Sequence, residues 1–120
     1  MPSATITITD STKAALDLLT LLTSSTTPGY SVVPAAGFQA LTTLGRVSYL
    51  SIQASPRNGN GTYIYRGDKD TDGGGNRQGK ELTPGTIDVM QGIYGEVHLS
   101  QVYIRGSSNG LIANVEWYYA

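Results

Sequence analysis

The second half of the chain consists of short strand-like runs separated by turn residues, and this alternation constrains the fold more than any other feature. The runs are rich in β-branched and aromatic residues and cover residues 62–66 (TYIYR), 87–90 (IDVM), 101–105 (QVYIR) and 111–118 (LIANVEWY). Gly, Asn, Asp, Ser and Pro lie between them. Such runs, bounded by turn formers, predict a small antiparallel β domain.

The composition limits the classes of function that the chain can serve. At 120 residues it predicts one domain, and its net charge of -1 provides no basic patch for nucleic acid. The absence of cysteine excludes a disulfide framework, so stability must come from packing or from assembly. The N-terminal sequence does not resemble a signal peptide, and the apolar stretch 14–22 is too short to cross a bilayer. We therefore expect a protein made in a cytoplasm that binds neither nucleic acid nor a membrane.

The first residues alternate between threonine and isoleucine, which places Ile6 and Ile8 on one side of an extended segment. This pattern predicts that residues 1–11 form an extended N-terminal arm or strand. A strand at a terminus is free to pair with another subunit as well as with its own sheet. We therefore predict that Ile6 and Ile8 contact a partner.

The period changes over residues 12–23. Apolar residues recur there at the spacing of one helix face, namely Ala15, Leu18, Leu19 and Leu22. Either Asp10 or Ser11 could cap the start of this helix, and residues 24–29 (SSTTPG) would end it. A strand is the alternative, because threonine is frequent in this segment.

Two pairs of strands are predicted to form hairpins. Residues 46–54 alternate cleanly and would pair with 62–66 through the turn 55–61. Residues 101–105 would pair with 111–118 through 106–110. The expected core faces carry Leu50 and Ile52 in the first strand, and Leu111, Ala113, Val115 and Trp117 in the last.

These elements predict a mainly β fold, a compact antiparallel β-sandwich or jelly-roll-like barrel with one short N-terminal helix. Residues 12–120 would form a single β-sandwich domain.

Catalytic chemistry has little support in this sequence. The single His98 has neither a cysteine nor a second histidine to work with, and no serine lies in a nucleophile elbow. Asp88 and Glu96 could meet across strands, but nothing else indicates a glycosidase dyad. We predict no enzymatic activity, no catalytic residues and no cofactor.

The polar loop 67–81 contains Asp68, Asp70 and Asp72 followed by Gly73, which resembles the start of an EF-hand calcium loop. The twelfth position is Gly79 rather than glutamate, and no helices flank the loop. We predict a solvated loop without a metal, and a calcium site is the alternative. The triplet RGD at 66–68 is interpreted as a strand end that turns into this loop.

Tyrosines provide the remaining candidates for binding. Tyr63 and Tyr65 share one face of a strand, and Tyr118 and Tyr119 lie near the end of the chain. Exposed aromatic side chains anchor protein interfaces or stack on sugars. We predict that these four tyrosines, with Ile6 and Ile8, are interface residues.

In the order of its segments, the chain resembles the small accessory β-sandwich proteins of tailed-bacteriophage virions. The segments that carry the resemblance are AALDLLTLL (14–22), VSYLSIQA (47–54), TYIYRG (62–67), GKELTPG (79–85) and QVYIRGSSNGLIANVEWYY (101–119). They cover most of the chain beyond residue 12, although the polar loop is longer and more acidic than the family suggests.

The resemblance implies a non-enzymatic structural protein of the virion. Within this class it favours a capsid decoration or cement protein that stabilises the shell. Its expected partners are the major capsid protein or other virion proteins, and its expected location is the capsid surface of a particle assembled in the host cytoplasm. It implies a homo-oligomer, for which a trimer would match the three-fold sites of an icosahedral shell. The alternatives are a tail, fibre or head-tail connector component, or a carbohydrate-binding host-recognition module.

Overall fold

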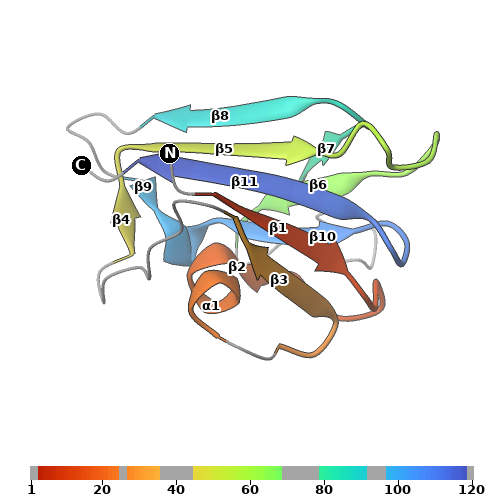
Figure 1. Cartoon of the computed structure of the whole chain (residues 1–120), viewed down its shortest axis with the longest axis horizontal. Helices are drawn as coiled ribbons and strands as arrows, with labels where there is room; N and C mark the ends of the chain where they lie inside the picture. The colour runs from red at the N-terminus through yellow and green to blue at the C-terminus, as the bar shows by residue number, and fades with distance from the viewer. Residues whose placement is uncertain (1–2, 25–26, 36–44, 69–78, 92–96, 119–120) are drawn as a thin grey trace.

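The computed structural model describes residues 3–24, 27–35, 45–68, 79–91 and 97–118 of the chain. These residues form three antiparallel sheets and one short α-helix (Figure 1). The prediction of a mainly antiparallel β protein with a short helix near the N-terminus is confirmed. Within the described ranges, no helix has the length and apolarity needed to span a membrane.

The largest sheet has five strands in the order β3-β1-β11-β5-β8, and all neighbours are antiparallel. These strands are β3 (Tyr30–Pro34), β1 (Ser3–Ile8), β11 (Ile112–Tyr118), β5 (Tyr49–Ala54) and β8 (Ile87–Gln91).

The second sheet has the order β2-β10-β6-β7 and lies on one side of the first (Figure 1). Its strands are β2 (Leu16–Asp17), β10 (Tyr103–Gly106), β6 (Ile64–Gly67) and β7 (Lys80–Leu82). A small third sheet pairs β4 (Arg46–Val47) with β9 (Val97–His98), which leads directly into the 3₁₀ turn η2 (Leu99–Gln101).

The two larger sheets bury their apolar side chains in one shared core. Side chains in β1 alternate between buried and half-buried, as expected for a strand with one face covered. Trp117 from β11 is fully buried. The second sheet contributes Ile64, Leu82 and Ile104 to the same core. Leu50 and Ile52 are buried as predicted, and the whole predicted set of the last strand is buried too.

Of the two forms predicted for the N-terminal segment, an arm or a strand, the described residues 3–8 form a strand in the interior of the sheet. β1 lies between β3 and β11, and the exposures of Ile6 and Ile8 are 0% and 1%. Gly106 shows how closely the second sheet approaches them, since a Cβ atom there would lie 2.8 Å from Ile8 Cγ1. Ile6 and Ile8 therefore contact the protein's own core. The prediction that they contact a partner is wrong for this packing.

Both predicted hairpins are also wrong. β5 belongs to the five-stranded sheet and β6 to the four-stranded sheet, so the segment between them connects two sheets. The same holds for β10 and β11. The physical reason is that consecutive apolar faces are buried here by facing each other across the core. A hairpin would place them side by side in one sheet.

The helix is shorter than predicted. α1 (Leu18–Thr23) begins after Asp17, whose carboxylate accepts hydrogen bonds from the Thr20 amide at 3.1 Å and the Thr20 hydroxyl at 2.8 Å. Asp10 instead accepts from the amide and hydroxyl of Thr12 in a separate turn, so it does not cap the helix. The buried residues of α1 are Leu18, Leu21 and Leu22, which follow the helical spacing and join the core.

The position of β1 leads to a test of its structural role. Because Ile6 is fully buried, Ile6→Ala should lower the free energy of unfolding by about 2–5 kcal/mol. Thr5 lies on the opposite face of the same strand, so Thr5→Val is the matched control and should change stability by less than about 1 kcal/mol. Urea unfolding of the three proteins measures both values. Equal stability of Ile6→Ala and the parent would contradict the interior placement of β1.

Candidate functional site

One side of the five-stranded sheet faces away from the core, and we call it the outer face. The pairing registers place the following described residues on it: Ser3, Thr5, Thr7, Ser31, Val33, Tyr49, Ser51, Gln53, Ile87, Val89, Gln91, Ile112, Asn114, Glu116 and Tyr118. The large hydrophobic residues that are exposed in the described part of the chain all belong to it. They are Val33 (58% exposed), Ile87 (55%), Val89 (50%) and Tyr118 (47%).

The outer face is almost free of charge. Among its described residues, Glu116 is the one charged side chain, and it lies on the central strand β11. The remaining side chains are apolar or carry neutral hydroxyl and amide groups. A broad surface with exposed apolar residues and few charges is typical of a protein interaction site.

The predicted interface residue Tyr118 lies on the outer face. Its ring packs against that of its cross-strand partner Tyr49, with the ring centroids 5.3 Å apart and the planes tilted by 54°. Sequence reasoning missed Tyr49, although it lies in a predicted strand. Tyr119, which was predicted together with Tyr118, lies outside the described residues.

Tyr65 lies on β6 of the other sheet, and Tyr63 lies near it, just before this strand begins. Their ring centroids are 6.0 Å apart, and the guanidinium carbon of Arg105 lies 4.9 Å from the centroid of the Tyr65 ring. Tyr65 is only 7% exposed, so it offers little surface to a partner, whereas Tyr63 is half-buried. The structure brings these two tyrosines together but places them apart from the outer face.

A cluster of three charged residues joins the edges of the two larger sheets. Asp88 on β8 is 5% exposed. It accepts hydrogen bonds from Arg66 Nε at 2.6 Å and from Lys80 Nζ at 2.8 Å. Arg66 and Lys80 are cross-strand partners on β6 and β7. The carboxylate therefore connects the edge strand of one sheet with two strands of the other.

The pKa of Asp88 results from two opposing effects. Burial acts to raise it, because a charged carboxylate loses hydration. The hydrogen bonds and positive charges of Lys80 and Arg66 outweigh this effect and hold the pKa below its usual value. Asp88 is consequently a charged, doubly paired carboxylate at neutral pH.

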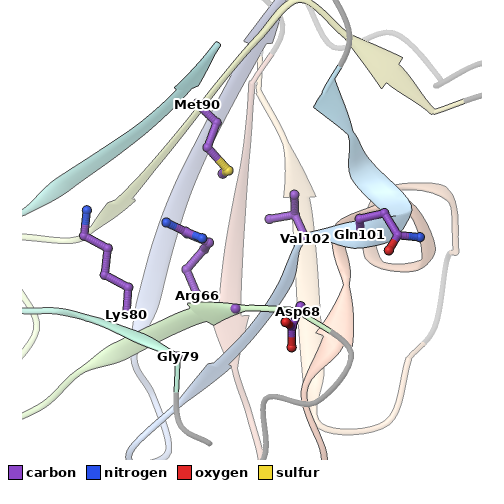
Figure 2. Close-up of a pocket in the computed structure, with 8 residues that line it drawn as sticks. Arg66, Asp68, Gly79, Lys80, Met90, Gln101 and Val102 are labelled. Carbon is purple, nitrogen blue, oxygen red and sulfur yellow. The ribbon is translucent and has the colours of Figure 1, made fainter. Parts of the chain in front are cut away.

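Beside this cluster lies a cavity of about 290 Å³ (Figure 2). At the margin of the cavity, Gly79 allows β7 to begin close to β6. The φ of Gly79 is +77°, and a Cβ atom at this position would lie 2.5 Å from the Arg66 carbonyl oxygen. The residues that line the cavity are Arg66, Gly67, Asp68, Gly79, Lys80, Met90, Gln101 and Val102.

Sequence reasoning considered Asp88 only as a partner of Glu96, which lies outside the described residues. In β8 the apolar Ile87 and Val89 point outward, while Asp88 and Met90 point inward. Only the pairing with Arg66 and Lys80 reveals the cluster.

The remaining predicted sites gain no chemistry from the structure. His98 is exposed on β9, where it is the cross-strand partner of Arg46. Asp70, Asp72 and Gly73 of the calcium alternative lie outside the described residues. In the ranges that the structure covers, no three side chains of His, Cys, Asp or Glu come together in a group that could hold a metal ion.

Comparisons of the chain with protein-family models, with curated proteins and with solved structures found no match. The function must therefore be inferred from the chain itself. The outer face and the cavity beside Asp88 are features of the described residues that could bind a partner or a ligand.

The charged cluster predicts how stability depends on pH. The folded pKa of Asp88 is lowered, so its contribution is complete above the unfolded pKa of about 3.9 and is lost as the pH falls below it. Asp88→Asn should lower the free energy of unfolding at pH 7 by about 1–3 kcal/mol. Its stability should also fall less between pH 5 and about 2.5 than that of the parent.

Glu116→Gln on the outer face is the matched control, because Glu116 is exposed and lies away from the cluster. Urea unfolding at each pH measures all three proteins. Parallel acid losses in the parent and in Asp88→Asn would contradict the stabilising role of the cluster.

Proposed function

We propose that the chain is a structural protein of a tailed-bacteriophage virion that decorates or cements the capsid shell and binds it through the outer face. The observation that carries this proposal is the outer face itself, because the large exposed hydrophobic residues of the described part of the chain all lie on this nearly uncharged face. The order of the sequence segments, which resembles that of small accessory virion proteins, supports the same function.

The fold proposed with this function is a β-sandwich made by the two larger sheets. Their shared core supports it, because Ile6 and Trp117 from one sheet and Ile104 from the other belong to a single buried cluster. In such an arrangement one sheet presents a continuous surface to a partner. The connecting segments then lie at the ends of the domain.

The partner that fits the outer face is another virion protein with a flat and largely uncharged surface. A second copy in a face-to-face arrangement fits less well. Both copies would bring Glu116 from their central strand into one neutral interface, where an unpaired carboxylate is costly. A cation on the shell protein opposite Glu116 would remove this cost. Assembly of the chain into a homotrimer would then use other surfaces.

Stabilisation of the shell follows from mass action. A protein that binds the assembled lattice but not its separated subunits shifts the equilibrium toward the lattice. Several copies or contacts add through multivalency, so each contact can be weak. Because the outer face carries one charge among its described residues, binding should depend little on salt concentration.

A tail, fibre or connector position would use the same face and differs only in the partner. The carbohydrate-binding alternative finds less support in the geometry. This alternative expects the loop 67–81 and the tyrosines near it to contact a glycan. Of these tyrosines, Tyr65 is 7% exposed with the Arg105 guanidinium over its ring, and Tyr63 is half-buried.

The test is to purify particles from the phage genome that encodes this chain and to locate the chain in them. Mass spectrometry should detect it at constant stoichiometry, and cryo-electron microscopy should show the five-stranded sheet facing the shell. Particles that lack the chain should lose their contents at a lower temperature. Absence of the chain from purified particles would overturn the proposal.

A charge placed on the outer face should break this contact. Val89 is 50% exposed, so Val89→Glu should leave the fold intact and lower binding to chain-deficient particles at least about tenfold, which corresponds to 1.4 kcal/mol. Asn60→Glu, in an exposed turn outside the outer face, is the matched control and should bind like the parent. Co-sedimentation measures both variants, and undiminished binding of Val89→Glu would exclude this face.

A further inference from the structure

The cavity beside the charged cluster is lined by the side chain of Arg66, whose guanidinium group is held in place by a hydrogen bond to Asp88. Arg66 donates through Nε to Asp88, and no described residue accepts a hydrogen bond from its two terminal nitrogens. Figure 2 shows the end of this side chain directed into the cavity toward Met90. The pairing with the buried Asp88 fixes the guanidinium before any ligand arrives, which lowers the entropic cost of binding.

The charged groups at the cavity balance in number but not in position. Arg66 and Lys80 are positive, and Asp88 and the lining residue Asp68 are negative. The Asp68 carboxylate points away from the Arg66 guanidinium (Figure 2). Lys80 Nζ retains further donors, since an ammonium group has three hydrogens and one is directed to Asp88. The remaining N–H donors of Arg66 and Lys80 can therefore bind an anion.

Two apolar side chains also line the cavity, together with the polar Gln101 and Asp68, and they come from two different parts of the fold. Met90 enters from β8, and Val102 follows η2. Both side chains are directed into the cavity in Figure 2. A cavity with cationic donors at one side and apolar carbon at the other suits a ligand of matching polarity.

We propose that this cavity binds a carboxylate group attached to a short aliphatic chain. The two terminal nitrogens of Arg66 would donate to the two carboxylate oxygens in a planar fork. Lys80 would add a second charge, and Met90 and Val102 would cover the aliphatic carbons. Two sources share this chemistry: a free small carboxylate, or the side chain of a glutamate on a partner protein. Binding in this cavity does not depend on capsid binding through the outer face, so one of the two proposals can be wrong while the other holds.

The test uses isotope-labelled protein and butyrate as the probe, followed by nuclear magnetic resonance. We expect saturable shifts at the amides of Arg66, Lys80 and Met90, with a dissociation constant on the order of millimolar for so small a ligand. Butylamine has the same chain with a cationic head and is the control ligand, which should produce no such shifts. N-acetyl-glutamate amide tests the second source, and saturable binding of it identifies a partner's glutamate as a competent ligand.

The variant Arg66→Lys keeps the positive charge beside Asp88 but lacks the fork, so butyrate should bind at least about tenfold more weakly. A second variant, Val102→Ala, keeps all charges and should weaken butyrate more than acetate. Thermal unfolding of both variants verifies that they are folded. Unsaturable shifts, equal binding of butyrate and butylamine, or unchanged binding in Arg66→Lys would overturn the proposal.

Discussion

The pairing of β11 with a neighbour on each side is the interaction on which the remaining structure depends. β11 is the central strand of the five-stranded sheet, with β1 on one side and β5 on the other. Its inward residues alternate strictly with outward ones, and the inward set ends in the fully buried Trp117. Because side chains on a strand point alternately to opposite faces, this one strand sets both the core and the outer face.

The same alternation explains how a sheet can be both stable and available for binding. Ala113, Val115 and Trp117 face the core, while Asn114 and Glu116 face outward. Neutral hydroxyl and amide side chains separate the exposed hydrophobic residues on the outer face, so the apolar area is distributed. Such a surface remains compatible with water and can still bury apolar area against a flat partner, which is the basis of the proposed role in a virion.

The Asp88 cluster shows a second way of joining the sheets. Apolar packing holds their centres, but at their edges a buried carboxylate bonds to two cations from the opposite sheet. A buried charge is tolerated only where its partners satisfy it, so the cluster fixes how β8 lies relative to β6 and β7. The cavity follows from this arrangement, since Arg66 is held at its wall by the same bond.

The sequence alone determined the mainly β class, the burial of Leu50 and Ile52, and the core set of the last strand, because alternation and turn residues are local signals. It also indicated a helix near Leu18, although Asp17 rather than Asp10 caps it. Tertiary structure decided which strands are neighbours, since pairing joins residues far apart in the chain. It placed Ile6 and Ile8 in the core, separated both expected hairpins, and turned Asp88 inward with Ile87 and Val89 outward. The alternation of a strand follows from its own residues, but the side that faces the core depends on the elements that pack against the strand.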